Sequence, residues 1–426
     1  MDKIYNDTIK ETLYKEILDN GLKVYMMPRQ NYNRQYAIFA TNYGSIDNSF
    51  IDPETGNTVT VPDGIAHFLE HKLFEGEEEN TFSQFARLGT STNAFTNFTT
   101  TAYLFSGTGN FQQSLVNLLD FVQNPYFTDE NVEKEKGIIT QEIRMYEDDP
   151  NYQAFFNLLQ GLYHYHPVRI DIGGTVESIK KITREDLYLC YNTFYHPGNM
   201  ILFLVGDFDP EETINLVKEN QARKDFPEWK GIKRVFPDEP PAIKENKIEK
   251  QMDVNQPLLM LGFKERELDK TERELVKQEI GTDMLLDLIT GKGTELYQSL
   301  YEDGLVDDDF DQHYTRERGY GYAIMGGKTK DPEKLYDRLL AGIKKAKDNL
   351  KEEDFSRVCK KYVGDYIESF NSFEIIAHEF VDYFFKGINY FEVIKIIQEI
   401  DLAYLAERFD QLFKEKSAVR SVISRG

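Results

Sequence analysis

The sequence predicts an α+β protein of two similar domains, each a mainly antiparallel sheet packed with helices. At 426 residues the chain is too long for one ordinary core, and an apolar fraction of 40% can fill two cores of about 200 residues each. A charged segment with four prolines lies at 226–250, and the strand and helix pattern roughly restarts after it. We therefore predict domains at 1–225 and 251–426, joined by a linker at 226–250.

In the first domain, strand and helix signals alternate along the chain. The helix expected at 64–75 follows Asp63, a good N-cap residue, and Gly76 suits the left-handed position after its end. Thr183 and Asp186 form a capping pattern that opens another helix. The expected strands lie at 22–29, 36–45, 91–107 (one strand or two) and 199–208, and the expected helices at 64–75, 81–88, 111–123, 128–147, 183–195 and from 209 onward.

The second half repeats this kind of architecture without evident sequence identity to the first. Its last segment, AVRSVIS, is expected to be the final strand. The other expected elements are a strand at 256–264, helices near 270–290 and 294–303, strand material at 309–328, and four helices between 331 and 416.

The charge of the chain restricts its partners. A formal net charge of -23 argues against nucleic acid as the main partner, because phosphate binding needs a basic surface. Acidity of this kind keeps a soluble protein dispersed, and it can also attract basic peptides. Both interpretations are compatible with the composition.

The cysteine count and the amino terminus favour a cytoplasmic protein. Cys190 and Cys359 are far apart and form neither a disulfide framework nor a CxxC metal motif. The first residues, MDKIYNDTIKETLYKEIL, contain acids and lack the apolar stretch of a secretory signal. No apolar run approaches the roughly 20 residues of a membrane helix, so we expect no membrane partner.

A candidate metal site lies in the sequence DGIAHFLEHKLFEG. On a helix, His67, Glu70 and His71 share one face, so both imidazoles can reach one ion with the carboxylate beside them. This order of residues is a known zinc peptidase motif. The alternative is a helix with incidental histidines, but neighbours such as Ile65 and Phe68 predict that the helix is largely buried, where polar side chains need partners. A catalytic zinc takes three protein ligands, so one ligand must come from elsewhere.

The expected source of the third ligand is the helix at 128–147, which Pro150 ends. Its buried side is predicted to contain Val132, Ile138, Ile139 and Met145, and its candidate acids are Glu133, Glu135, Glu142 and Glu147. Glu135 and Glu142 are seven residues apart, two turns along the same stripe. Two acids on a half-buried stripe suggest one ligand and one carboxylate behind the ligands. Simple solvation is the alternative for any single glutamate here.

These motifs resemble those of the pitrilysin family, which includes insulin-degrading enzyme and the mitochondrial processing peptidase. The similarity rests on His67-Phe-Leu-Glu70-His71 followed by EKEKGIITQE, and on later stretches such as FYHPGNMILFLVGDFD. The resemblance implies that Glu142 is the third zinc ligand and that Glu135 assists near the site.

The resemblance also implies how substrate binds and how the chain assembles. GTSTNAFTNFTTTAYLF (89–105) is similar to the family's substrate-binding edge strand, with Asn93 and Ala94 where backbone contacts to a peptide are made. The family fold implies that the two domains form half of a clam-shell chamber. At this length the chain is similar to short bacterial processing-protease-like members, which need a second subunit to close the chamber.

One stretch departs from the family pattern. Active members place an Arg and a Tyr, seven residues apart, where they hold the substrate carbonyl. The corresponding segment at 295–310, ELYQSLYEDGLVDDDF, has no Arg. We therefore expect a homologous partner subunit to supply the pair. The second choice is a local pair just beyond this segment, drawn from Arg316, Arg318, Tyr320 and Tyr322.

Together these features predict a zinc metallopeptidase that hydrolyses extended or unfolded peptides as the catalytic half of a heterodimer. Glu70 is the expected base that takes a proton from water. The main alternative is a non-catalytic scaffold subunit of the same family, like the core subunits of the respiratory bc1 complex. Those subunits have lost part of the metal motif, whereas every ligand is present here. A zinc hydrolase of an unrelated fold is a further alternative.

Overall fold

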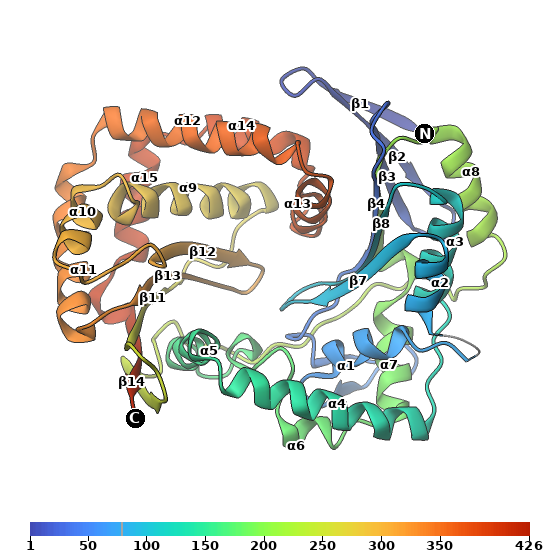
Figure 1. Cartoon of the computed structure of the whole chain (residues 1–426), viewed down its shortest axis with the longest axis horizontal. Coiled ribbons are helices and arrows are strands. Elements are labelled where there is room, and N and C mark those ends of the chain that lie inside the picture. Colours follow the sequence, from blue (N-terminus) through green and yellow to red (C-terminus); the bar gives the residue numbers. More distant parts are fainter. Residues whose placement is uncertain (78–79) are drawn as a thin grey trace. The chain divides into compact units, whose positions relative to one another are not determined.

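The computed structural model describes residues 1–77 and 80–426 and contains two compact units (Figure 1). Unit 1 comprises Met1–Ile143, Ile170–Phe236 and Ser369–Phe385, and unit 2 comprises Arg144–Arg169, Pro237–Glu368 and Lys386–Gly426. The predicted division at 226–250 assigns residues 144–169 to the first domain and 369–385 to the second. In the structure, residues 144–169 belong to unit 2 and residues 369–385 to unit 1.

Unit 1 is built on a seven-stranded mixed sheet. In spatial order its strands are β1 (Asp2–Asn6), β2 (Glu11–Ile17), β3 (Lys23–Pro28), β9 (Met200–Gly206), β4 (Gln35–Thr41), β8 (Thr101–Gly107) and β7 (Thr90–Thr96). Only the pair of β3 and β9 is parallel. Strands β1 and β2 were not predicted. A small separate ladder joins β5 (Ser49–Ile51) to β6 (Thr58–Thr60).

Helices cover both faces of this sheet. The large core lies on one face, under α1 (Ile65–Leu73), α2 (Thr81–Arg87), α3 (Phe111–Val122), α4 (Asp129–Glu147), α7 (Arg184–Phe194) and α8 (Pro210–Gln221). A short helix, α6 (Val176–Ile179), precedes α7. The opposite face receives α13 (Phe373–Phe385), whose contacts are with β4 and β9. The predicted capping box of Thr183 and Asp186 is confirmed at the start of α7.

Unit 2 has a five-stranded sheet. Its spatial order is β10 (Lys247–Met252), β14 (Ala418–Arg425), β11 (Leu258–Lys264), β13 (Tyr320–Lys328) and β12 (Asp311–Glu317), and only β10 and β14 are parallel. The helices of the unit are α5 (Pro150–Leu162), α9 (Glu272–Thr290), α10 (Glu295–Glu302), α11 (Pro332–Ala346), α12 (Glu352–Ser369), α14 (Val393–Gln398) and α15 (Leu402–Leu412). Helix α5 packs on β14 and β11, and α9 packs on β12.

The two sheets share one topology. In unit 1 we number the strands β3, β4, β7, β8 and β9 from one to five in chain order. Across the sheet they then lie in the order one, five, two, four, three. In unit 2 the strands β10 to β14 occur in the same order, with the same single parallel pair. The predicted fold class, two similar domains of mainly antiparallel sheet packed with helices, is confirmed.

Helix α5 corrects the interpretation of Pro150. This proline was predicted only to end the preceding helix, and α4 does end at Glu147. Pro150 is also the first residue of α5, where its missing N–H costs nothing, and Asp149 caps that helix by accepting a hydrogen bond from the backbone N–H of Tyr152. The packing of α5 on unit 2 explains why residues 144–169 belong to that unit.

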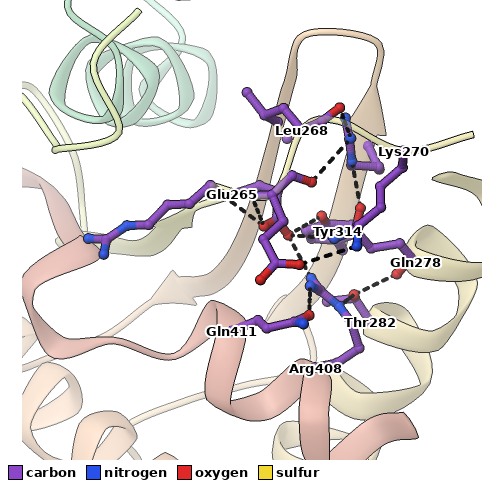
Figure 2. Close-up of polar contacts among 12 residues, drawn as sticks. Glu265, Leu268, Lys270, Gln278, Thr282, Tyr314, Arg408 and Gln411 are labelled. Carbon is purple, nitrogen blue, oxygen red and sulfur yellow. Dashed lines mark hydrogen bonds and ion pairs between the residues drawn. The ribbon is translucent and has the colours of Figure 1, made fainter. Parts of the chain in front are cut away.

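The interior of unit 2 contains a buried network of polar side chains (Figure 2). Arg408 on α15 donates to Glu265 just beyond β11 over 2.6 Å, and Tyr314 on β12 donates to the same carboxylate oxygen over 2.6 Å. Gln278 on α9 donates to Glu265 and accepts a hydrogen bond from Arg316. Removing one partner of a buried ion pair costs about 3–5 kcal/mol, because the other charge is left uncompensated. The network therefore fixes α9 and α15 against the sheet.

Neither cysteine is in a disulfide: Cys190 is buried, Cys359 is half-buried, and both thiols are free. Among the described residues, no helix combines the length and the apolar character that crossing a membrane requires. The cytoplasmic location stays a prediction.

Candidate metal centre

Helix α1 begins at a glycine that no other residue could replace without strain. The predicted N-cap, Asp63, is wrong: the residue before the helix is Gly64, with φ of 86°. A Cβ at Gly64 would lie 2.3 Å from the carbonyl oxygen of Gly173, so the loop before α6 packs directly on the start of α1. Asp63 instead accepts a hydrogen bond from Asn48. This close approach brings the loop at 171–174 to the side of the metal motif.

The three residues of the motif lie on one face of α1, as the sequence predicts. The rings of His67 and His71 are 4.5 Å apart between centroids. Their Nε2 atoms lie 3.7 Å and 3.5 Å from the two carboxylate oxygens of Glu142 on α4. Figure 1 shows α1 and α4 side by side in unit 1. The structure thus brings together the three side chains that the sequence analysis, with its family resemblance, named as ligands.

The orientation of α4 differs in part from the prediction. Val132 and Ile139 are buried as expected, but Ile138 is 46% exposed and Met145 is 61% exposed. The helix presents a narrower apolar stripe to the core than its composition suggests, because apolar residues also occur on exposed faces. Glu135 lies on the buried stripe and is 4% exposed.

The donor set fits a zinc ion. Ligand atoms of His67, His71 and Glu142 all lie within 4.8 Å of one another, the one such group of three or more among the described residues. Two ligands about 2.0–2.1 Å from a tetrahedral zinc lie roughly 3.4 Å apart, close to the histidine–glutamate separations in this structure. Two imidazoles and one carboxylate also match the ligand types of catalytic zinc sites. The arrangement could therefore hold zinc with little movement.

The protonation of the site favours a cation. Burial, with the neighbouring His71, lowers the pKa of His67 to about 4, so its ring is neutral and can act as a ligand at neutral pH. Burial raises the pKa of Glu70 and also that of Glu142, to which the charges of Glu135 and Asp171 add. Crowded carboxylates disfavour one another's ionised form, and a bound cation relieves that repulsion.

Glu135 lies behind the ligands and orients one of them. Its carboxylate is 3.0 Å from Nδ1 of His71 and 3.8 Å from the ammonium of Lys72. Burial acts to raise the pKa of Glu135. The hydrogen bond from His71 and the nearby positive charges, including that of Lys72, outweigh burial, so the pKa is lowered overall. Because an ionised carboxylate can only accept, Nδ1 of His71 donates, and in the neutral ring the lone pair is then on Nε2, 3.5 Å from Glu142.

Thr96 completes the surroundings of Glu70, and sequence reasoning missed it. Its hydroxyl donates to Oε2 of Glu70 over 2.8 Å from the end of β7. Asn93 and Ala94 lie on the same strand, exposed and half-buried respectively. Among the described strands, β7 pairs only with β8, so one of its edges is free. The threonine-rich stretch 96–101 was the available signal, but composition does not show which hydroxyl reaches the helix.

We expect Glu142→Gln to lose most of its zinc and Glu135→Gln to keep most of it. An amide is a poor zinc ligand, whereas loss of a carboxylate behind a ligand lowers metal affinity by about 10- to 100-fold. Competition with a chelator of known affinity measures both constants. Glu133→Gln, an exposed acid on the same helix, is the matched control. Equal losses in the two variants would contradict the assignment of Glu142 as the ligand.

The fold and the donor set define a class: a two-unit α+β protein with an inverted His-x-x-Glu-His helix and a third carboxylate ligand, the arrangement of zinc peptidases of this type. Residues 55–176 match the family model described as insulinase (peptidase family M16), and residues 181–362 match the one described as the peptidase M16 inactive domain. The chain belongs to peptidase family M16. The resemblance inferred from the sequence is thereby confirmed.

Individual relatives agree with this assignment. The chain is 45% identical to an uncharacterised zinc protease, YmfH, of Bacillus subtilis strain 168, over 93% of this chain and 92% of that protein. It superposes on the crystal structure of an M16-like peptidase from Alicyclobacillus acidocaldarius with a TM-score of 0.94 and 41% identity, covering 98% and 99% of the two chains. A protease structure from Helicobacter pylori, at 20% identity, has the same fold with a TM-score of 0.84 over 97% and 99% of the chains.

Proposed function

We propose that this chain is a zinc metalloendopeptidase that hydrolyses peptide bonds of extended or unfolded peptides. The observation that supports this most is the position of Glu70. It lies one residue from His71 on a helix whose two imidazoles meet Glu142, and a hydroxyl of the edge strand holds its carboxylate. A scaffold has no need of a carboxylate beside a complete donor set.

Each residue of the site has a separate role in the proposed reaction. Zinc bound by His67, His71 and Glu142 would polarise the substrate carbonyl and lower the pKa of a water toward about 7. Glu70 then accepts a proton from the attacking water and returns it to the leaving nitrogen. Burial raises the pKa of Glu70 above that of an ordinary glutamate, which makes the carboxylate a stronger base toward the water. The hydrogen bond from Thr96 fixes the orientation of this carboxylate.

The free edge of β7 is the proposed binding strand for the peptide. An extended peptide that adds to an exposed sheet edge gains main-chain hydrogen bonds whatever its sequence. Thr96 at the end of β7 touches Glu70, so a strand added along Asn93 and Ala94 would bring a peptide bond to the catalytic carboxylate. Such binding requires an unfolded or extended substrate.

We further propose that a homologous subunit supplies the Arg and Tyr pair, because residues 295–310 contain no Arg and cannot form it. The alternative, a local Arg and Tyr pair just beyond this segment, has little support because most of its candidate side chains are buried or already paired. Arg316 is fully buried, and its guanidinium donates to Gln278 and to backbone carbonyls including that of Leu268. Tyr320 and Tyr322 are 1% and 2% exposed. Arg318 is exposed and pairs with Glu272 over 3.2 Å.

Removal and return of the metal tests the proposed reaction. We expect a chelator to abolish hydrolysis of an extended fluorogenic peptide by the natively purified protein, together with whatever co-purifies. One equivalent of zinc per chain should restore hydrolysis, and magnesium should not. Hydrolysis that resists metal removal would rule out the zinc mechanism. Stoichiometric zinc without hydrolysis in the native assembly would favour the scaffold alternative.

A further inference from the structure

Buried hydroxyl groups continue behind Thr96, on the side away from Glu70. Glu70 is 8% exposed, and it accepts a hydrogen bond from Thr96 over 2.8 Å. The hydroxyl of Thr96 lies 3.3 Å from that of Thr101, which has no exposed surface. Thr96 and Thr101 lie directly opposite each other at the turn end of the β7–β8 ladder. Because α1 packs against both strands, the hairpin brings the two hydroxyls beside the metal helix (Figure 1).

Two tyrosines extend this arrangement into the core of unit 1. Tyr103 lies two residues after Thr101 on β8, so both side chains point to the helical layer. The hydroxyl of Tyr103 is 2.9 Å from that of Tyr195, the residue that follows α7. Tyr195 also forms a hydrogen bond with Thr101. We refer to the hydroxyl groups of Thr96, Thr101, Tyr195 and Tyr103 as the hydroxyl chain.

Both tyrosines keep their hydroxyl hydrogens. Burial raises the pKa of Tyr103 and of Tyr195 well above the usual range, and the negative charge of Glu70 adds to this effect. Tyr103 has no exposed surface, and Tyr195 is 2% exposed. A neutral phenol has one hydrogen to donate and can also accept. Each member of the hydroxyl chain can therefore donate to one neighbour and accept from another.

The direction of the hydrogen bonds at the two threonines follows from the number of hydrogens. An ionised Glu70 can only accept, so the single hydroxyl hydrogen of Thr96 is used there. Thr96 can then accept from Thr101. The hydrogen of Thr101 is shared between Thr96 and the backbone carbonyl oxygen of Tyr43, which lies 2.9 Å away.

The same reasoning gives the direction at the two tyrosines. In the described part of the protein, the hydroxyl of Tyr103 has Tyr195 as its hydrogen-bond partner. A buried hydroxyl hydrogen needs an acceptor, so Tyr103 donates to Tyr195. Tyr195 then has its own hydrogen free for Thr101. Every member of the hydroxyl chain thus donates toward Glu70.

We propose that Tyr195 and Tyr103 are positioning residues for Glu70, on which they act through the hydroxyls of Thr101 and Thr96. The proposal rests on the proposed function, in which Glu70 is the base. Hydrogen bonds that all point one way polarise one another, which strengthens the last of them. A base that is held in one orientation spends more of its time in the geometry that the reaction needs.

Tyr191 provides a matched control in the same aromatic cluster. Its ring stacks on that of Tyr195, with centroids 4.9 Å apart and planes at 19°. Its hydroxyl donates to the backbone carbonyl of Val122 over 2.9 Å, outside the hydroxyl chain. Replacement of either tyrosine by Phe removes one buried hydrogen bond, so the two changes should destabilise the fold to a similar extent. Only the change at Tyr195 alters the contacts that lead to Glu70.

Single and double variants test the hydroxyl chain through turnover of an extended fluorogenic peptide by the native assembly. We expect Tyr195→Phe to lower kcat by about 3- to 10-fold, the effect of one buried hydrogen bond, with KM and zinc content unchanged. Tyr191→Phe should match the wild type. In a Thr96→Val background, Tyr195→Phe should lower kcat no further, because the hydroxyl chain is already broken. In a Thr96→Ser background, which keeps the hydroxyl, the effect of Tyr195→Phe should remain.

A spectroscopic readout tests the same coupling without hydrolysis. The full-length protein is isotope-labelled at Cζ of tyrosine, whose nuclear magnetic resonance shift follows the hydrogen bonding of the phenol oxygen. We expect Glu70→Gln, which removes the charge at the end of the hydroxyl chain, to shift the resonances of Tyr195 and Tyr103 and not that of Tyr191. Thr96→Val should remove most of this response.

The outcomes distinguish the hydroxyl chain from the function on which it rests. Equal losses of kcat in Tyr195→Phe and Tyr191→Phe would overturn the proposal, because the effect would then be one of stability. Independent effects of Thr96→Val and Tyr195→Phe, or tyrosine resonances that ignore Glu70→Gln, would also overturn it and leave the peptidase intact. Coupled resonances in a protein that never hydrolyses peptides would support the hydroxyl chain and reject the peptidase.

Discussion

Glu70→Gln is expected to retain one zinc per chain and to lose peptide hydrolysis by about 10²–10⁴-fold in kcat. Glutamine has nearly the shape of glutamate, and its amide oxygen can still accept the hydrogen bond that Thr96 donates. It cannot accept a proton from water or return one to the leaving nitrogen. The donor atoms of His67, His71 and Glu142 are not altered.

Zinc content by atomic emission and turnover of a fluorogenic peptide measure the two halves of this expectation on one preparation. Glu133→Gln, an exposed carboxylate on α4, should match the wild type in both. Normal turnover by Glu70→Gln would show that another group is the base. Loss of zinc together with activity would mean that Glu70 supports the metal instead.

Addition of the proposed partner subunit is expected to raise turnover by about 10²–10³-fold over the isolated chain. That factor is what one lost donor to the developing oxyanion costs. A homodimer cannot supply the Arg and Tyr pair, since residues 295–310 contain no Arg in either copy. A partner that has the pair completes the site from outside the chain.

The decisive comparison is turnover by the chain alone, across concentrations that span self-association, against turnover after reconstitution with the purified partner. Replacement of the partner's Arg by Ala should remove the gain without removing zinc from this chain. Full turnover by the isolated chain at every concentration would contradict the heterodimer. Loss of that turnover in Arg318→Gln would then identify a local cation, which is exposed and can be replaced without opening the core.

The metal helix could be predicted from the sequence because its three functional residues lie within five positions of the chain. The spacing of His67, Glu70 and His71 places them on one helical face whatever the rest of the fold does. The capping box at Thr183 is likewise read within four residues. The stripe of Glu135 and Glu142 was also predictable, although Ile138 and Met145 show that apolar residues on α4 do not define the buried side by themselves.

The features that sequence reasoning missed depend on contacts between distant residues. Thr96 reaches Glu70 only because β7 ends beside α1, and no short pattern records that approach. The ring of His378 on α13 stacks on Phe95 of β7, 283 positions away along the chain, so α13 could not be assigned to unit 1 from periodicity. Gly64 replaced the expected cap at Asp63 because another backbone, at Gly173, leaves no space for a side chain.

Because the two sheets share one strand order, the buried network of unit 2 can be compared with the metal site of unit 1. Helix α9 follows β11 as α1 follows β4, and each helix bonds to the next strand of its sheet: Gln278 to Arg316 on β12, Glu70 to Thr96 on β7. In unit 2 the negative charge of Glu265 is balanced by a side chain of the same unit, Arg408. In unit 1 the corresponding place gathers carboxylates around two imidazoles. If it holds the proposed zinc, the positive charge that balances them comes from solution. The two units would then differ in how they depend on their surroundings: loss of the metal should loosen unit 1, including α13 from late in the chain, while unit 2 stays folded.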